Sequence, residues 1–198
     1  MNRLVLASGS RTRLEMLRRA GVSCEVDPPA VDEAALRASL RAEGADVAGV
    51  AEALAELKAM RIARRHPGAL VLGADQMLEC GGVWHEKPAD RRAARQQLLA
   101  LRGKTHMLVT VAVLVKDEQR IWHDVDRARM VMRPFTEAFL DWYLETAGDA
   151  VCASVGAYQV EGLGAQLFAR IEGDQTTILG LPLMPVLDML RVHGLLRT

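Results

Sequence analysis

The chain has few cysteines, no excess of charge of either sign and no long apolar run. Its three cysteines, Cys24, Cys80 and Cys152, are scattered and odd in number, which excludes the spacing of a metal motif or a disulfide framework. A reducing cytoplasm is therefore the expected location. The apolar runs are far shorter than the roughly 20 residues that cross a bilayer, so we expect no membrane span. The first residues also turn polar too early for a secretory signal peptide.

The charges cancel, with 25 basic and 25 acidic residues. Bulk binding to nucleic acid or to an anionic membrane is not expected, and any positive site must be local. Half of the 198 residues are hydrophobic and a quarter are charged, as in an ordinary globular protein. We find no repeat, linker or low-complexity segment, so we predict a single domain over residues 1–198, with room for two lobes around a cleft.

The predicted elements alternate between strands and helices. The N-terminal unit is a strand at residues 3–7, a small polar turn at 8–10 and a helix from Arg11 that Ser10 caps and Gly21 ends. Residues 31–33 and 76–88 read as loops. The other predicted elements are strands at 23–26, 69–74, 105–115 and 120–132, helices at 46–65, 90–101 and 136–148, two short strands within 155–172, and a last helix with Pro182 in its first turn. This order favours an α/β sheet with helices on both faces.

Asp75 follows an unbroken apolar run, and the pattern predicts that it lies at the end of a buried strand. Burying a carboxylate is costly unless it is paired, and ligands of α/β folds bind beyond the carboxyl ends of strands. From its position alone, Asp75 is equally compatible with a general base or metal ligand and with a residue that caps the next turn.

The turn around Ser8 allows close approach of an anion to a helix start. Arg13 lies in the first helical turn, where its charge opposes the helix dipole, a placement that makes sense beside a bound phosphate. A plain capped helix with an exposed arginine explains the same residues.

Other charged residues are ordinary when taken singly: Glu33 in a loop, Lys58 on the long helix, Lys87 before Pro88, and Glu161 beside glycines that indicate tight backbone geometry. Together with Asp75 and Arg13, they combine acids, which can hold a metal and activate water, with cations, which can neutralise phosphates. Hydrolysis of a phosphate anhydride needs this combination.

Eight segments resemble, in order along nearly the whole chain, the signatures of the Maf family of nucleotide pyrophosphatases. They are Leu6-Ala7-Ser8-Gly9-Ser10-Arg11-Thr12-Arg13, Val31-Asp32-Glu33, Lys58-Ala59, Gly73-Ala74-Asp75-Gln76, Lys87-Pro88, Leu101-Arg102-Gly103-Lys104-Thr105-His106, Gly156-Ala157-Tyr158 and Gly180-Leu181-Pro182-Leu183. One tripeptide would be weak support, but eight segments in register are strong.

The resemblance implies a two-lobed α/β fold of the Maf and inosine-triphosphatase type, with a long mixed central sheet, flanking helices and a deep cleft. It also implies hydrolysis of a nucleoside triphosphate to the monophosphate and pyrophosphate, with Mg²⁺ or Mn²⁺. Family members are often dimers, so a homodimer is compatible with it. The implied catalytic residues are Asp75, Glu33, Lys58 and Lys87, and the implied substrate contacts are Ser8, Thr12, Arg13, Gln76 and Glu161; the metal ligands stay undecided between Asp75 and Glu33.

The choice of nucleotide is narrowed by three positions. The family branch that acts on dTTP and UTP has Arg, Thr and Gln where this chain has Thr12, Gln76 and Glu161. Gln76 and Glu161 resemble the 7-methyl-GTP branch, although that branch has tryptophan in place of Thr12. A carboxylate accepts two hydrogen bonds from the N1–H and N2–H groups of guanine. The dTTP/UTP activity, and a nucleotide-binding regulator of septum formation without turnover, are the alternatives.

Overall fold

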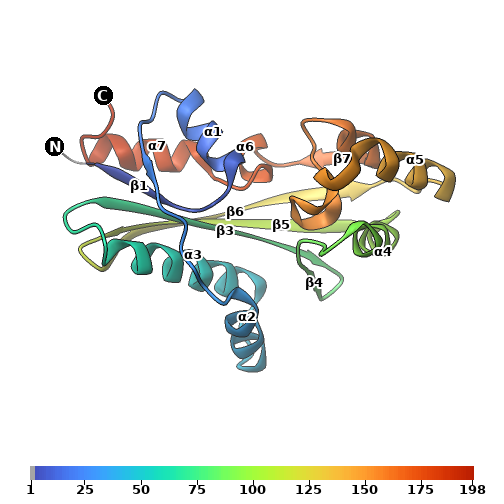
Figure 1. The fold of residues 1–198 in the computed structure, drawn as a ribbon, viewed down its shortest axis with the longest axis horizontal. Helices are drawn as coiled ribbons and strands as arrows, with labels where there is room; N and C mark the ends of the chain where they lie inside the picture. The colour runs from blue at the N-terminus through green and yellow to red at the C-terminus, as the bar shows by residue number, and fades with distance from the viewer. Residues whose placement is uncertain (1–2) are drawn as a thin grey trace. The chain divides into compact units, whose positions relative to one another are not determined.

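The computed structural model describes residues 3–198, and its centre is a mixed sheet (Figure 1). The strand order is β2-β1-β3-β5-β6-β7, and β4 also pairs with β3. The strands are β1 (Leu4–Ala7), β2 (Glu25–Val26), β3 (Leu70–Cys80), β4 (Val83–His85), β5 (Thr105–Lys116), β6 (Gln119–Met132) and β7 (Phe168–Glu172). β1 is parallel to both β2 and β3, whereas the β3–β4 and β6–β7 pairs are antiparallel. The prediction of a mixed α/β fold is confirmed.

Cα distances divide the chain into two compact units. Unit 1 comprises the described part of Met1–Gln76 with Val109–Arg127 and Asp174–Thr198, and unit 2 comprises Met77–Leu108 and Ala128–Gly173. The predicted single domain and its deep cleft stay predictions.

Helices cover both faces of the sheet within unit 1 (Figure 1). Helix α3 (Val47–Ala63) lies on one face, and α1 (Arg11–Arg19) and α7 (Leu183–Val192) lie on the other. The core under α1 and α7 joins alternate residues of β1 and β3 to the two helices, including Leu6, Leu17, Leu72, Leu187 and Leu190. Alternation along the strands places the intervening residues against α3. The short helix α6 (Gln175–Ile178) precedes α7.

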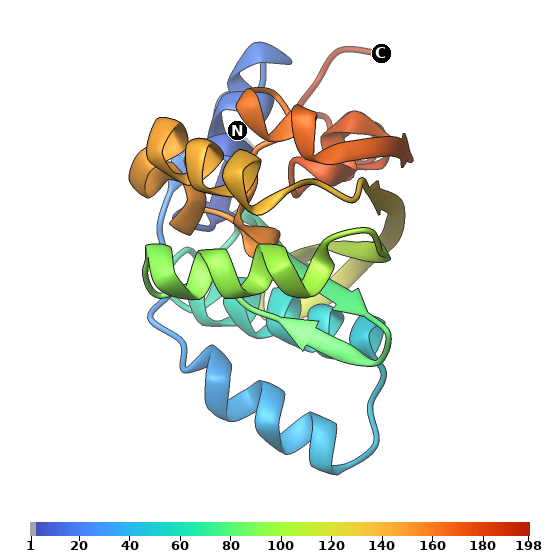
Figure 2. The same ribbon diagram turned by 90° about the vertical axis from the view of Figure 1, so that its right-hand side faces the viewer.

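Helix α2 (Glu33–Ala42) differs from the other long helices of unit 1 because it buries no residue. Asp32 caps it, with its side chain accepting a hydrogen bond from the backbone N–H of Ala35. The helix lies on the outer side of α3 in both views (Figures 1 and 2). Its attachment therefore depends on polar contacts more than on burial.

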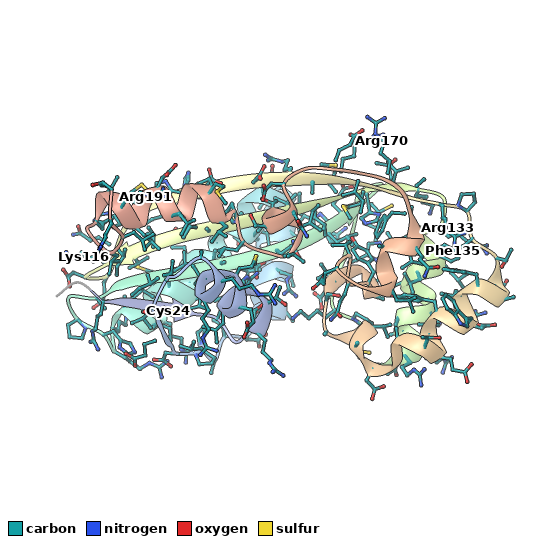
Figure 3. The ribbon with its side chains drawn as sticks, turned by 90° about the horizontal axis from the view of Figure 1, so that it is seen from above. Cys24, Lys116, Arg133, Phe135, Arg170 and Arg191 are labelled. Carbon is teal, nitrogen blue, oxygen red and sulfur yellow. The ribbon has the colours of Figure 1, made fainter. Side chains whose placement is uncertain are left out.

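Unit 2 contains helices α4 (Arg91–Leu101) and α5 (Glu137–Ala147), and three 3₁₀ turns: η1 (Gly148–Cys152), η2 (Val155–Ala157) and η3 (Leu163–Leu167). Its centre is aromatic, with rings of His106, Tyr158 and Phe168 in contact. Arg133 and Phe135 lie close together beside α5 (Figure 3), and the Arg133 guanidinium lies 4.2 Å from the centre of the Phe139 ring.

Four sequence predictions are wrong in detail. Asp75 does not end its strand, because β3 continues to Cys80, and the predicted loop after it contains the β3–β4 hairpin. Glu33 is not in a loop but is the first residue of α2. Residues 155–172 form two 3₁₀ turns before the single strand β7 rather than two strands. Helix α6 was not predicted.

The remaining predicted elements are present with shifts of a few residues at their ends. The β5–β6 turn contains Asp117 and Glu118, which both have positive φ, as a two-residue hairpin turn requires. Across residues 3–198, every helix is too short or too polar to traverse a bilayer.

Candidate active site

In the turn between β1 and α1, the neighbours of Ser8 determine whether its hydroxyl group donates or accepts hydrogen bonds. Ser8 is buried, and its Oγ accepts hydrogen bonds from the backbone N–H of Ser10 at 3.2 Å and from Arg13 Nη1 at 3.1 Å. These two bonds use both lone pairs, so the Ser8 hydroxyl hydrogen remains for another acceptor. Ser10 caps α1, as predicted, by accepting from the backbone N–H of Arg13.

Arg13 joins three segments of unit 1. Its Nε donates to Gly180 O at 2.7 Å, and its Nη1 donates to Ala74 O at 3.0 Å as well as to Ser8. The guanidinium has five N–H groups, so these bonds fix its plane and leave the Nη2 amino group for a ligand. Burial lowers the pKa of Arg13, and the charges of Asp75 and Glu33 oppose that shift.

Lys58 lies on the buried stripe of α3, which also contains Leu54, Ala55 and Ile62. Gly73 of β3 allows α3 to lie very close to the sheet. A Cβ atom at position 73 would lie 2.2 Å from Ala55 O and 2.9 Å from Ala59 Cβ. The backbones approach this closely because no side chain separates them, which places Lys58 beside the strand.

Two carboxylates converge on the Lys58 ammonium. Its Nζ donates to Asp75 Oδ1 at 2.6 Å and lies 2.8 Å from Glu33 Oε1. Glu33 is also held by Arg37, whose Nη2 donates to Glu33 Oε2 at 2.6 Å. Helix α2 therefore delivers one acid of the site and β3 delivers the other, and Lys58 connects them.

The two acids have opposite pKa shifts. Burial raises the pKa of Asp75 above its ordinary value, and this outweighs the opposing effect of Lys58 and Arg13. Burial also acts to raise the pKa of Glu33, but the hydrogen bond and charge of Lys58, with Arg37 and Arg13, bring it below its usual value. Among residues 3–198, no group is bonded to Asp75 Oδ2 although this oxygen is buried. Asp75 thus has one anchored oxygen and one oxygen that can accept a proton or bind a cation.

Gln76 lies beyond the last residue of β3 that pairs with β1, since this ladder ends at the Ala7–Gly73 pair. Alternation along the strand directs its side chain away from the face occupied by Asp75. Gln76 Nε2 lies 2.9 Å from Thr110 Oγ1 and 3.0 Å from Thr177 O.

The structure thus brings together Ser8, Arg13, Glu33, Lys58 and Asp75 of the predicted residues, whereas Gln76 is directed to the other face of β3, near Gly180; all six lie within unit 1. Thr12 is exposed in the first turn of α1. Lys87, which follows β4, and Glu161, which precedes η3, belong to unit 2 and are exposed. The predicted roles of all nine site residues stay predictions.

Sequence reasoning missed Arg37, Thr110 and Thr177. Arg37 stands four residues after Glu33, a spacing that forms ion pairs on a helix, so recognition of α2 would have revealed it. Thr110 lies inside the apolar run of β5. Because buried polar side chains are hydrogen-bonded, a threonine within such a run indicates a hydrogen-bonded network. No pattern in the sequence points to Thr177.

A family model described as "Maf-like protein" matches residues 3–193. The chain belongs to the Maf family. It is 58% identical over 190 residues to the nucleoside triphosphate pyrophosphatase of Paramagnetospirillum magneticum, covering 96% of this chain and 98% of the relative. It is 50% identical over 192 residues to the 7-methyl-GTP pyrophosphatase of Mesorhizobium japonicum, covering 97% and 96%. Among solved structures it matches a HAM1 protein from Coxiella burnetii, with 17% identity, a TM-score of 0.46, and coverage of 68% and 75%. The family resemblance predicted from the eight segments is confirmed.

Proposed function

We propose that this Maf family member hydrolyses a nucleoside triphosphate to the monophosphate and pyrophosphate. The observation that carries the proposal is the buried Asp75–Lys58–Glu33 cluster beside Ser8 and Arg13. The names of the relatives, which are nucleoside triphosphate and 7-methyl-GTP pyrophosphatases, support the same reaction.

Asp75 is the group that activates water in this proposal. Lys58 holds Oδ1, so Oδ2 accepts the proton of the attacking water. The water oxygen bonds to the α-phosphorus while the bond from that phosphorus to the oxygen that bridges to the β-phosphate breaks. The raised pKa of Asp75 makes it a stronger base than an exposed carboxylate. The proton is on Asp75 after the step, and pyrophosphate leaves with the electron pair of the broken bond.

The phosphates are bound by donors. Ser8 contributes its hydroxyl hydrogen and Arg13 its Nη2 amino group, and both are oriented before a ligand arrives because their other contacts are satisfied. Lys58 adds charge next to the acids. Lys87 is assigned to the same task by the family resemblance alone.

The donor set fits a divalent cation. Mg²⁺ is usually bound through one or two carboxylates together with substrate phosphates. Glu33 is a carboxylate of this kind, and Asp75 Oδ2 is another in the alternative in which it holds the metal instead of accepting the proton. No group of three acidic, histidine or cysteine ligands exists within residues 3–198, so protein atoms would supply only part of the coordination. Bound Mg²⁺ or Mn²⁺ would neutralise phosphate charge and acidify water.

A panel of 7-methyl-GTP, GTP, UTP, dTTP and CTP, assayed for pyrophosphate, tests the function. We expect release from at least one nucleotide and a preference for the 7-methyl-guanine base, since Glu161 and Gln76 match that branch. A preference for UTP or dTTP would support the pyrimidine alternative. Tight nucleotide binding without product over a long incubation would contradict turnover and favour the regulator of septum formation.

Glu161→Gln is the matched variant for base choice. If Glu161 accepts the guanine N–H groups, the variant should lose preference for 7-methyl-GTP over UTP by about tenfold, because one hydrogen bond to a charged group is removed. An unchanged ratio would remove Glu161 from base recognition. The cytoplasmic location and a homodimer belong to the same proposal, and sedimentation of the purified chain tests the dimer.

A further inference from the structure

The amide of Gln76 is held by its nitrogen end. Nε2 lies within 2.9–3.1 Å of Thr110 Oγ1, Thr177 O and Ile178 O. Carbonyl oxygens only accept hydrogen bonds, so the nitrogen must face them. In the reverse orientation, the amide oxygen would lie against two carbonyl oxygens, and the network therefore determines the orientation.

Thr110 is the side chain that completes this network. Its hydroxyl donates to Thr177 O at 2.8 Å, which commits its single hydrogen, so it meets Gln76 as an acceptor. Thr177 is held in turn because its hydroxyl donates to Asp126 Oδ2 at 2.6 Å. Both threonines are fully buried, where hydrogen bonds are stronger than in water.

The amide oxygen of Gln76 points away from Thr110 and Thr177, toward Arg13 and Gly180. A Cβ atom on Gly180 would lie 3.8 Å from Gln76 Oε1 and 3.5 Å from Arg13 Nη2, so the oxygen and the guanidinium border the same position. A phosphate oxygen next to Oε1 would be repelled, because both atoms are acceptors. Arg13 Nη2 carries hydrogens but is assigned to the phosphates above, so the partner of Oε1 is another group that carries a hydrogen.

We propose that Thr110 is a positioning residue that fixes Gln76 with its amide oxygen outward, so that Gln76 accepts a hydrogen bond from an N–H or O–H group of the nucleoside. The proposal rests on nucleotide binding as proposed above. It specifies that Gln76 accepts a hydrogen bond from the nucleoside and does not donate one. It also assigns a role to Thr110, which lies outside the catalytic cluster.

Thr110→Val and Thr110→Ser form the matched pair of variants. Valine places a methyl group where the hydroxyl oxygen lies 2.9 Å from Nε2, and a methyl carbon needs about 3.5 Å, so the amide must move away from its acceptors. Serine keeps the hydroxyl. The purified full chain is used throughout, with its melting temperature as a check that each variant is folded.

The first measurement is independent of catalysis. The side-chain NH₂ signals of Gln76 in a ¹⁵N-labelled sample are assigned by their loss in Gln76→Leu, and their exchange with water is measured. We expect slow exchange in the wild type and in Thr110→Ser, and exchange about tenfold faster in Thr110→Val. Equal exchange in wild type and Thr110→Val, or faster exchange in Thr110→Ser as well, would overturn the positioning role.

The second measurement locates the hydrogen donor. GTP is compared with N1-methyl-GTP and UTP with N3-methyl-UTP for the base, and ribonucleotides are compared with their 2′- and 3′-deoxy forms for the sugar. In wild type and Thr110→Ser, kcat/KM should fall on the order of tenfold for the analogue that lacks the donor, and Thr110→Val should lose this preference. If Thr110→Val keeps every preference of the wild type, the proposal is wrong. If no nucleotide yields pyrophosphate, the proposed function fails, while the exchange measurement still decides the positioning.

Discussion

Gly73 controls how closely α3, and with it Lys58, approaches Asp75. In Gly73→Ala, the new Cβ would lie 2.2 Å from the carbonyl oxygen of Ala55, roughly 1 Å inside an ordinary contact. That oxygen belongs to the helix backbone and cannot rotate away, so α3 or β3 must shift. A shift of about 1 Å would lengthen the 2.6 Å Lys58–Asp75 bond beyond hydrogen-bonding distance.

We expect two effects from Gly73→Ala. Overpacking of this kind costs about 1–3 kcal/mol of unfolding free energy, and misplacement of a catalytic group by about 1 Å can lower kcat on the order of 100-fold. Urea unfolding and pyrophosphate release measure them. Gly162→Ala is the stability control, since a Cβ atom there meets no atom within 4 Å.

If Gly73→Ala were as stable and as active as the wild type, Gly73 would not set the distance between α3 and β3. An equal loss of stability in Gly162→Ala would contradict the overpacking, because the loss would then follow from alanine in general. A stable but inactive Gly73→Ala protein would show that the strand and helix adapt while the Lys58–Asp75 geometry does not.

Three further predictions concern other contacts. Burial lowers the pKa of His106 to about 4, so the unfolded chain, with an ordinary pKa near 6.5, takes up the proton first as the pH falls. Stability should fall by on the order of 3 kcal/mol between pH 6.5 and 4, in urea titrations, and His106→Phe should flatten the curve. Lys58→Met should lower the free energy of unfolding by about 3 kcal/mol, because it leaves Asp75 buried without its cation. The double variant Lys58→Met with Asp75→Asn should recover most of this loss. Losses that simply add in the double variant would contradict the pairing. Asp32→Ala should speed backbone hydrogen exchange in α2 about fivefold, because the cap contributes about 1 kcal/mol to a helix that buries no residue. The melting temperature should not change. A lower melting temperature would show that α2 unfolds together with the rest of the protein.

Much of the fold follows from local patterns. Ser10 caps α1 as predicted, and Asp46 and Thr136, the first residues of two other predicted helices, accept the same kind of backbone hydrogen bond. The apolar run before Asp75 is a buried strand of the sheet, as its composition predicts. These features depend on residues within one helical turn or one strand, so the sequence suffices.

The errors have nonlocal causes. The strand was predicted to end at Asp75 because a charged residue rarely continues a buried run, but Lys58 compensates the charge from a helix 17 residues earlier. Helix α2 is the exception, because its signals are local: Asp32 is a cap, and Leu36 and Leu40 have helical spacing, although the folded helix buries no residue. The orientation of Gln76 depends on backbone oxygens about 100 residues away.

The sequence predicted which residues gather around Lys58 but not their geometry. The family segments gave Asp75, Glu33 and Lys58, and the structure brings their side chains together around one ammonium group. That Ser8 retains a hydrogen to donate follows only from the contacts of Ser10 and Arg13.

The role of Asp75 as proton acceptor is tested by the rate of pyrophosphate release by Asp75→Asn compared with the wild type, on the preferred nucleotide with Mg²⁺. Asparagine keeps the shape but cannot accept the proton, so we predict a loss of about 100- to 10,000-fold with the fold retained. Wild-type rates in Asp75→Asn, or release of orthophosphate instead of pyrophosphate by the wild type, would contradict the account.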